Sequence, residues 1–213
     1  MNGESTLPDL TVEIAFLGCE GTICGIDEAG RGPWAGPVVA AAVVLDWGNI
    51  PPGLNDSKKL TAARRATLFD AIKASASVGV GIGTVEEIDA LNILRANDLA
   101  MLRAFAALRT APDAALIDGN RVPPGWPCRA RALVGGDGRS LSIAAASIIA
   151  KVTRDRIMAD LARAHPGYGW ERNQGYGTAQ HRAALDRLGV TPHHRRSFRP
   201  IHNILRFYGD PLD

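Results

Sequence analysis

The chain has 213 residues, of which 46% are hydrophobic and 22% are charged, and its formal net charge is +2. These values are typical of a globular protein with a hydrophobic core. The apolar run at residues 33–45 is too short for a membrane span and carries two prolines, so we expect no membrane contact and a cytoplasmic location. Three cysteines without a CxxC pair indicate free thiols and argue against zinc: Cys19, Cys24 and Cys128.

The charges are distributed unevenly along the chain. Residues 1–118 hold 9 Lys/Arg against 15 Asp/Glu, a net of −6, whereas residues 119–213 hold 15 against 7, a net of +8, and all five histidines. An acidic half joined to a basic half suits a metal-dependent enzyme that acts on a polyanion. A solvated surface with a chance bias would give the same pattern.

In chain order, the first predicted elements are two strands within residues 22–45, joined by a turn rich in Gly and Pro. A helix over residues 62–74 and a Gly-rich strand over residues 76–85 follow. Residues 86–109 predict one long amphipathic helix, whose apolar face is formed by Leu91, Leu94, Leu99, Leu102, Phe105 and Leu108.

The second half continues the alternation of strands and helices. Residues 114–118 predict a short apolar strand that ends at Asp118, and another strand follows a Pro-rich loop. Helices are expected over residues 141–165, which Pro166 closes, and over residues 179–188. Alternating strands and helices imply an α/β fold, and the hairpin near the N-terminus makes its sheet mixed.

Four carboxylates share one sequence context, because each follows an apolar or glycine segment and precedes a turn or a helix start: Asp27, Glu28, Asp118 and Asp137. Sites in open α/β sheets collect where strands end, so these residues could converge. Converging carboxylates repel one another unless cations stabilise them, and oxygen-only ligands favour Mg²⁺ or Mn²⁺. Two such ions about 4 Å apart would clamp a phosphodiester and activate a water. Turn or cap roles are the alternative, above all for Asp137.

The adjacent pair raises a geometric question. Successive side chains on a regular strand point to opposite faces of the sheet. Asp27 and Glu28 can meet one metal cluster only if the strand twists or ends there, or if one residue contributes its backbone carbonyl. The sequence leaves these possibilities open.

Five motifs in register give the chain a family resemblance. It resembles ribonuclease HII, the type 2 ribonuclease H, over nearly its whole length except about the first 20 residues and the last few. The motifs that carry the resemblance are GIDEAGRGPWAGPVVAAAVVL, NDSKKL, IDGN, GGDGRSLSIAAASIIAKVTRD, and NQGYGT followed by GVTPHHRRSF.

The resemblance implies an endonuclease that cuts the RNA strand of RNA–DNA hybrids and cuts at single ribonucleotides in duplex DNA. It implies that the four acids are metal ligands, that Gly30, Arg31 and Gly32 form the family's Gly-Arg-Gly motif, and that Tyr176 senses the RNA–DNA junction. The implied fold is ribonuclease H-like, a mixed sheet of about five strands flanked by helices with a helical C-terminal extension. We expect an N-terminal segment (1–21), a catalytic domain (22–165) and a basic, aromatic substrate-binding extension (166–213).

The chemistry of the Gly-Arg-Gly motif fits this role. Only the 2′-hydroxyl distinguishes RNA from DNA at a given sugar, and glycines let the backbone approach a sugar closely. The ring of Tyr176 could pack on the adjacent deoxyribose, where an extra hydroxyl would not fit. A plain tight turn, or an ion pair between Arg31 and the nearby acids, are the other interpretations.

Further residues are weaker candidates. Ser147, Lys151 and Asp155 are four apart and share a helix face; Lys151 could contact phosphate and Asp155 could be a further metal ligand, or all three could form a polar stripe. His193 and His194 could hold a water at the scissile bond or be simply exposed. Phosphate contacts are equally compatible with solvated charges for Lys58, Lys59, Arg195 and Arg196.

Two positions depart from the family pattern as the resemblance suggests it. Gln174 stands where many relatives carry lysine, which removes one phosphate-contacting charge. Trp34 stands where a smaller apolar residue is usual, and we expect it to change only packing. Two other functions are alternatives: a hybrid-binding module without catalysis, and a nucleotide-binding enzyme that uses residues 79–84. Without a heptad or an apolar interface stripe, we expect a monomer.

Overall fold

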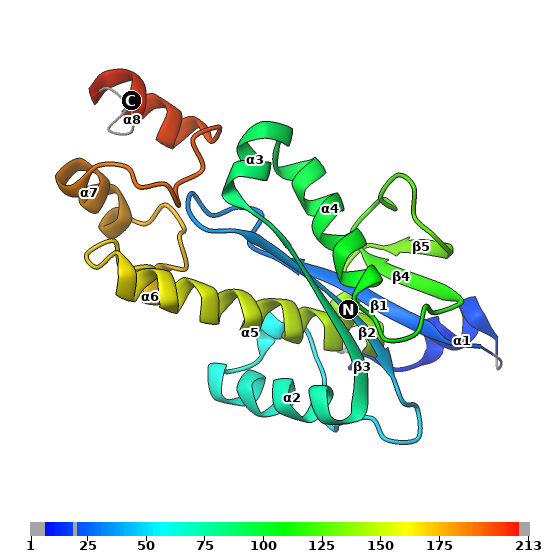
Figure 1. Ribbon diagram of the computed structural model, residues 1–213. Coiled ribbons are helices and arrows are strands. Elements are labelled where there is room, and N and C mark those ends of the chain that lie inside the picture. The colour runs from blue at the N-terminus through cyan, green and yellow to red at the C-terminus, as the bar shows by residue number, and fades with distance from the viewer. Residues whose placement is uncertain (1–6, 19–20, 209–213) are drawn as a thin grey trace, which may run out of the picture.

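The computed structural model describes residues 7–18 and 21–208 (Figure 1), and in this part of the chain a five-stranded sheet has the order β3-β2-β1-β4-β5. β1 pairs antiparallel with β2, and β2 pairs antiparallel with β3, whereas β4 is parallel to both β1 and β5. The predicted mixed sheet is therefore confirmed. The strands are β1 (Ile23–Ala29), β2 (Val38–Leu45), β3 (Ala76–Gly83), β4 (Ala114–Asp118) and β5 (Arg129–Leu133).

Helices cover both faces of the sheet. α3 (Val85–Leu91) and α4 (Ile93–Ala106) lie on one face, and α2 (Ala62–Ser75) and α5 (Leu141–Ala164) lie on the other (Figure 1). The C-terminal helices gather beyond the end of α5 in Figure 1. The remaining helical elements of the described chain are α1 (Thr11–Leu17), α6 (Trp170–Asn173), α7 (Ala179–Leu188), α8 (Arg199–Tyr208) and two 3₁₀ turns, η1 (Ser57–Lys59) and η2 (Gly136–Gly138).

The single helix predicted over residues 86–109 is wrong, because the chain breaks at Asn92. This residue has a φ of 75°, and its side chain accepts hydrogen bonds from the backbone N–H groups of Leu94 and Arg95. Asparagine tolerates this left-handed conformation and caps the next helix at the same time. The break leaves Leu91 and Leu94 exposed, at 39% and 43%. The buried face of α4 consists instead of Ala96, Asn97, Ala100, Met101, Ala104 and Phe105.

α5 packs directly against β1, because the residues at their crossing are small. A methyl group on Gly25 would overlap the backbone of Ser142 and Ile143. The next turn of α5 presents Ala144, Ala145 and Ala146, and all three are fully buried. Interiors packed this closely do not absorb added volume without shifts of the backbone. The sheet and α5 therefore form one rigid support for residues near the ends of β1 and β4.

We expect Gly25→Ala to lower the free energy of unfolding by about 3 kcal/mol, because the added methyl group forces α5 away from β1. Gly48→Ala is the matched control: a methyl group there meets only the Asp46 carboxylate at an ordinary distance, so its effect stays within about 1 kcal/mol. Denaturant unfolding measures both variants. Equal effects of the two substitutions would contradict the close packing of β1 on α5.

Candidate active site

The parallel pairing of β1 and β4 brings two of the predicted acids together. The paired register ends with Ile26 opposite Ile117, so the next residues on the two strands are Asp27 and Asp118. Neighbouring strands lie about 4.8 Å apart, and in-register residues of a parallel pair face the same side. The two carboxylates therefore extend side by side from the carboxyl ends of adjacent strands.

Asp27 and Glu28 leave β1 on opposite faces of the sheet, as the alternation requires. The side chain of Ser147 on α5 faces Asp27, whereas that of Asn97 on α4 faces Glu28. Both carboxylates nevertheless line one cavity of about 340 Å³ together with Asp118. This arrangement is possible because β1 ends one residue later, at Ala29. Asp27 and Glu28 can thus reach one site because the strand ends there.

The same cavity gathers most of the other candidate residues. Besides the three acids, its lining includes Gly30, Arg31, Gly32, Ser57, Lys58, Ser147, Lys151, Arg154 and Tyr176. A second cavity of about 300 Å³ adjoins it and shares Glu28, Arg31 and Asp118. The Asp118–Asn120 turn and the exposed end of α4 line the rest of that second cavity. Glu28 and Asp118 therefore lie between the two cavities, and Asp27 lines the first.

Asp137 approaches this cluster from η2. Its carboxylate lies 3.5 Å from the Lys58 Nζ atom, and the preceding residue, Gly136, donates its backbone N–H to Asp118 Oδ1 at 2.7 Å. Asp137 is buried. The turn that carries it is therefore attached to one of the other acids.

The electrostatics of the acids favour a bound cation. Burial raises the pKa of Asp27 well above its ordinary range, and the charges of Glu28 and Asp118 raise it further. Burial also raises the pKa of Glu28, which the neighbouring Arg31 partly offsets through an ion pair of 3.2 Å. For Asp137, burial and the nearby Asp56 raise the pKa against the opposing effect of Lys58. Such a set of carboxylates ionises fully only beside additional positive charge.

The donor chemistry of the site fits a hard divalent ion, although the side chains are not gathered around one point. Among the described residues, no group of three or more His, Cys, Asp or Glu side chains is arranged so that it could hold a metal ion as it stands. The donors are all oxygens, the set that Mg²⁺ and Mn²⁺ prefer. Closure around an ion would need rotations of these carboxylates at the end of a rigid sheet.

Two buried arginines, which the sequence did not identify as a pair, hold the loop between β1 and β2. Arg195 donates to the carbonyl oxygens of Gly30 at 2.5 Å, Arg31 at 2.9 Å and Gly36 at 2.9 Å. Arg154 donates to those of Ala35 at 3.1 Å, Pro37 at 3.0 Å and Gln174 at 3.0 Å. Burial lowers the pKa of Arg195 to about 9 and that of Arg154 to about 10, so both are charged at neutral pH. The expectation that Arg195 contacts phosphate is wrong, because its side chain is fully buried and its donors are bonded to backbone carbonyl oxygens.

The histidines of the C-terminal extension are structural as well. His194 is fully buried; its Nε2 atom lies 3.0 Å from His181 Nε2, and its Nδ1 atom accepts the Thr191 N–H at 2.9 Å. Both interpretations of His194, a holder of the scissile-site water and an exposed loop residue, are wrong. His193 is half-buried and packs its ring against His165, with 4.8 Å between the ring centroids.

The other weak candidates lie on α5 or at the 3₁₀ turn η1. Ser147 is buried and donates to the Ser57 hydroxyl at 2.8 Å, and Lys151 lies beside it in the cavity wall. Asp155 forms an ion pair of 2.7 Å with Lys151, so its carboxylate is already occupied. Lys59 and Lys58 are exposed at the 3₁₀ turn η1.

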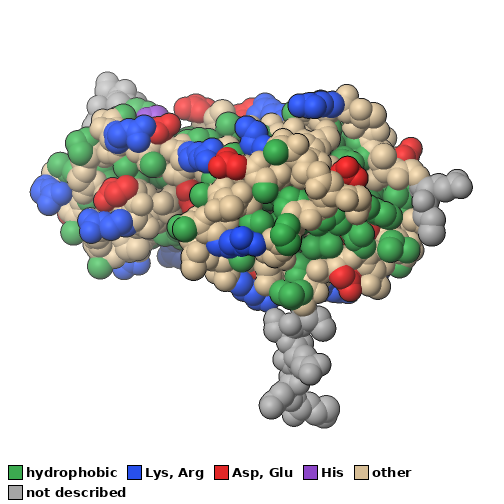
Figure 2. Space-filling view, turned by 90° about the horizontal axis from the view of Figure 1, so that it is seen from below, with side chains coloured by type: hydrophobic (Ala, Val, Ile, Leu, Met, Phe, Trp, Pro, Cys, Tyr) green, Lys and Arg blue, Asp and Glu red, His purple; other side chains and the backbone are tan. Residues whose placement is uncertain are grey.

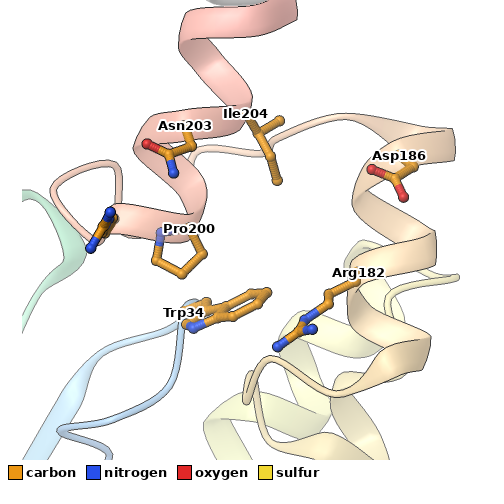
Figure 3. A pocket seen from close by; sticks show the side chains of 7 residues that line it. Trp34, Arg182, Asp186, Pro200, Asn203 and Ile204 are labelled. Atoms are coloured by element: carbon orange, nitrogen blue, oxygen red, sulfur yellow. The ribbon is translucent and has the colours of Figure 1, made fainter.

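Trp34 packs against a buried cluster that includes Trp170, Leu185 and Ile201. Its indole ring lies against Gly177 and lines a separate cavity of about 460 Å³. Figure 3 shows Arg182 of α7 reaching toward this ring, with Pro200, Asn203 and Ile204 of α8 on the other side. The Arg182 guanidinium lies 5.4 Å from the ring centroid. Sequence reasoning missed this cavity because its walls come from three distant segments.

The mixed sheet, its flanking helices and the acids at adjacent strand ends define a ribonuclease H-like protein. Solved structures support this class. The crystal structure of ribonuclease H2 from Pyrococcus horikoshii OT3 matches with a TM-score of 0.73 at 30% identity, over 89% of this chain and 100% of that chain. Bst-RNase HIII, solved in complex with Mn²⁺, shares the fold at a TM-score of 0.70 and 22% identity, over 87% of this chain and 70% of that chain.

The sequence comparisons narrow the class further. The family model for ribonuclease HII matches residues 24–201. Ribonuclease HII of Ruegeria pomeroyi is 65% identical over 202 residues, which cover 94% of this chain and 86% of that relative. The chain therefore belongs to the ribonuclease HII family and is a metal-dependent endoribonuclease that acts on RNA–DNA hybrids. Within the described residues, no helix is long and apolar enough to cross a membrane.

The buried histidine pair predicts a pH dependence of stability. Burial, together with His181, lowers the pKa of His194 to about 3, whereas an unfolded histidine titrates near 6.5. Above about pH 6.5 its neutral form is favoured in both states, and stability is lost as the pH falls from about 6.5 toward 3. Each unit then costs about 1.4 kcal/mol for this one proton.

We expect His194→Asn to show a shallower loss of unfolding free energy than the unchanged protein between pH 7 and pH 5, because asparagine cannot bind the proton. Denaturant titrations at a series of pH values measure both slopes. His202→Asn, at an exposed position of α8, is the control and should leave the slope unchanged. Identical slopes for the His194 variant and the unchanged protein would contradict the neutral buried histidine.

Proposed function

We propose that Asp27, Glu28, Asp118 and Asp137 bind the divalent ions that the reaction requires, Mg²⁺ or Mn²⁺. The observation that carries this proposal is the convergence of three carboxylates on one cavity at the ends of β1 and β4. Asp137 completes the set through its turn, which is bonded to Asp118. Ions bound there would supply positive charge for the scissile phosphate, the attacking water and the leaving oxygen, as in a two-metal mechanism.

The protein's own side chains prepare this site. The backbone N–H of Glu28 holds the carboxylate of Asp27 in place at 2.7 Å, and Ser147 lies beside it in the cavity wall. Arg31 neutralises part of the charge on Glu28. Lys58 and Lys151 stand at the cavity wall, where they suit phosphate oxygens of a bound strand,. Asp155 stays a candidate for a further ligand, in competition with its ion pair to Lys151.

The Gly-Arg-Gly loop and Tyr176 are proposed to read the sugar at the cleavage site. Gly30 has a φ of 96°, and a methyl group on it would overlap the Arg154 side chain, so the loop conformation requires glycine here. Tyr176 is 49% exposed, and its ring carbon lies 3.4 Å from where a methyl group on Gly32 would stand. The backbone and the ring thus form two walls of one slot, suited to a 2′-hydroxyl beside a deoxyribose. Cutting at a single ribonucleotide in duplex DNA follows from this arrangement.

The C-terminal extension, residues 166–213, is proposed to guide the duplex away from the catalytic cavity. Exposed arginines occur on α6, α7 and α8: Arg172, Arg182, Arg187, Arg199 and Arg206. In Figure 2, Lys and Arg side chains are spread over the end of the molecule that these helices form. Trp34, two residues after Gly32, lines the cavity between α7 and α8 on this side of the molecule. A monomeric state and a cytoplasmic location stay predictions from the sequence.

The deciding experiment is cleavage of duplex DNA that contains one ribonucleotide, with Mg²⁺ or Mn²⁺ added. We expect Asp118→Asn and Asp27→Asn to lower kcat by roughly 10³-fold or more, the scale of losing one member of a cooperating catalytic set. Both variants should stay folded, because an amide oxygen can still accept the Gly136 or the Glu28 N–H. Asp70→Asn, on the exposed side of α2, is the control. Turnover retained in either site variant would remove the assignment of the metal ligands.

Tyr176→Ala should affect the single-ribonucleotide substrate far more than a long hybrid. The missing ring removes the packing against the deoxyribose next to the ribonucleotide, and base- or sugar-stacking contacts of this kind contribute about 1–3 kcal/mol. We therefore expect kcat/KM to fall at least about tenfold more on the first substrate. Tyr176→Phe, which keeps the ring, should retain the preference. Equal losses on both substrates would argue against a junction-reading role.

A further inference from the structure

The N-terminal helix α1 carries a fully buried carboxylate, Glu13, outside the residues that the family model matches. Its Oε1 atom accepts hydrogen bonds from the Ser140 hydroxyl at 2.6 Å, the Ser142 hydroxyl at 2.6 Å and the Ser142 backbone N–H at 2.9 Å. These donors form the first turn of α5. Glu13 thus caps, from a distant part of the chain, the helix that follows the turn bearing Asp137.

Backbone contacts attach the same two segments a second time. The Leu141 N–H donates to the Asp9 carbonyl oxygen at 3.2 Å, and Asp9 forms an isolated β-bridge with Ser140. The Asp9 side chain also accepts the Thr11 N–H at 2.9 Å, at the start of α1. The chain entering α1 is therefore fixed to the chain entering α5.

The other side of α1 rests on the strands that lead to the acids. Val12, Phe16 and Leu17 pack against a buried cluster, whose members come from β1, β4, β5 and α5: Ile23, Ala114, Leu116, Leu133 and Ile143. Arg129 of β5 donates to the Phe16 carbonyl oxygen at 2.7 Å and stacks over its ring at 4.7 Å. α1 therefore spans the strand that ends in Asp118 and the helix that follows Asp137.

A chain of hydrogen bonds connects Glu13 to the catalytic cavity. Glu13 binds Ser140; the Ser140 N–H donates to the Gly136 carbonyl oxygen at 2.8 Å; and the Gly136 N–H donates to Asp118 Oδ1 at 2.7 Å. Asp137 lies inside the turn that these bonds close. Displacement of Ser140 would consequently move one acid directly and loosen the hold on another.

Stability alone is a poor explanation for this carboxylate. A buried carboxylate costs several kcal/mol of desolvation, and among the described residues the Glu13 Oε2 atom has no hydrogen-bond partner. Ser140 already caps α5 by accepting the Ile143 N–H. What the Glu13 carboxylate adds is a fixed position for the residues before that cap.

We infer that Glu13 is a positioning residue for the metal site, acting through Ser140 on the turn of Asp137 and on Asp118. This inference rests on the proposed function of those acids as metal ligands. It assigns the N-terminal segment a part in the reaction. A cap that served the fold alone would change stability and leave metal binding as it is.

The test compares Glu13→Ala, Glu13→Gln and Ser142→Ala with the full-length unchanged protein. Mn²⁺ titrations by calorimetry report metal affinity without turnover. Steady-state kinetics at varied Mg²⁺ give kcat, the substrate KM and the metal concentration for half-maximal rate. Asp113→Asn is the matched control, because Asp113 accepts a backbone N–H and a hydroxyl from Thr22 at 2.8 Å and 3.1 Å. That contact lies at the beginning of β4, the opposite end from Asp118.

We expect Glu13→Ala to weaken Mn²⁺ binding and to lower kcat at fixed Mg²⁺ by about 10–100-fold, the scale seen when a partner of a metal ligand is lost. The substrate KM should stay within about twofold, because Glu13 is remote from the surface that holds nucleic acid. Glu13→Gln should recover most of the loss, since its amide oxygen can accept the same bonds. Ser142→Ala should shift metal affinity in the same direction by less, and Asp113→Asn should not shift it.

Unchanged Mn²⁺ affinity and unchanged metal dependence in Glu13→Ala would overturn the positioning role, whatever happened to its melting temperature. If Glu13→Ala does not fold, Ser142→Ala decides, and a metal affinity equal to that of the unchanged protein in this variant overturns the inference. Failure of the proposed function has a different signature. In that case the unchanged protein and Asp118→Asn bind Mn²⁺ alike and cleave alike.

Discussion

The direct contact between α5 and β1 is the constraint on which the rest of the structure depends. Gly25 leaves no room for a side chain there, so the longest helix in the described chain lies immediately against the central strand. From this contact, Ser147 and Lys151 reach the cavity at the end of β1, and the first turn of α5 fixes the position of η2. Acids on β1, β4 and η2 can therefore be close together and mutually repulsive without the fold yielding, because close-packed interiors deform little.

The loop between β1 and β2 is held by a different means, which is charge buried against backbone oxygens. Arg154 and Arg195 together donate to six carbonyl groups of the Gly30–Pro37 loop and Gln174. A loop with three glycines and two prolines has few side chains that could pack it in place. Guanidinium groups supply several donors in a fixed plane and so can fix a loop of this composition. Through the buried side chain of Arg195, the C-terminal extension thereby fixes the backbone of the Gly30–Gly36 segment.

Elements with a strong local signal were predictable from the sequence, and features that depend on long-range contacts were not. The five strands, α2, α5 and α7 followed from periodicity and from glycine and proline breakers, because these features act within a few residues. The break at Asn92 was missed because the leucine spacing on both sides continues a helical pattern, while the actual burial is determined by alanines against the glycines of β3. The burial of Arg195 and His194 was equally invisible, since basic residues in a Pro-containing segment usually remain solvated.

Glu13 shows most clearly that residues outside the sequence motifs contact the structure behind the site. The first family motif begins at Gly25, within the strand that contains Asp27. A glutamate in the segment before it has no sequence feature that distinguishes it from a solvated charge. Its role becomes visible only in the fold. α1 lies where β4, β5 and α5 meet, and the carboxylate of Glu13 reaches the start of the helix that follows Asp137. Placement of metal-binding groups within a fraction of an ångström needs supporting contacts behind them. At the proposed metal site, the supporting contacts extend to a helix before the first motif, so the structure behind the site is larger than the segment that carries the motifs.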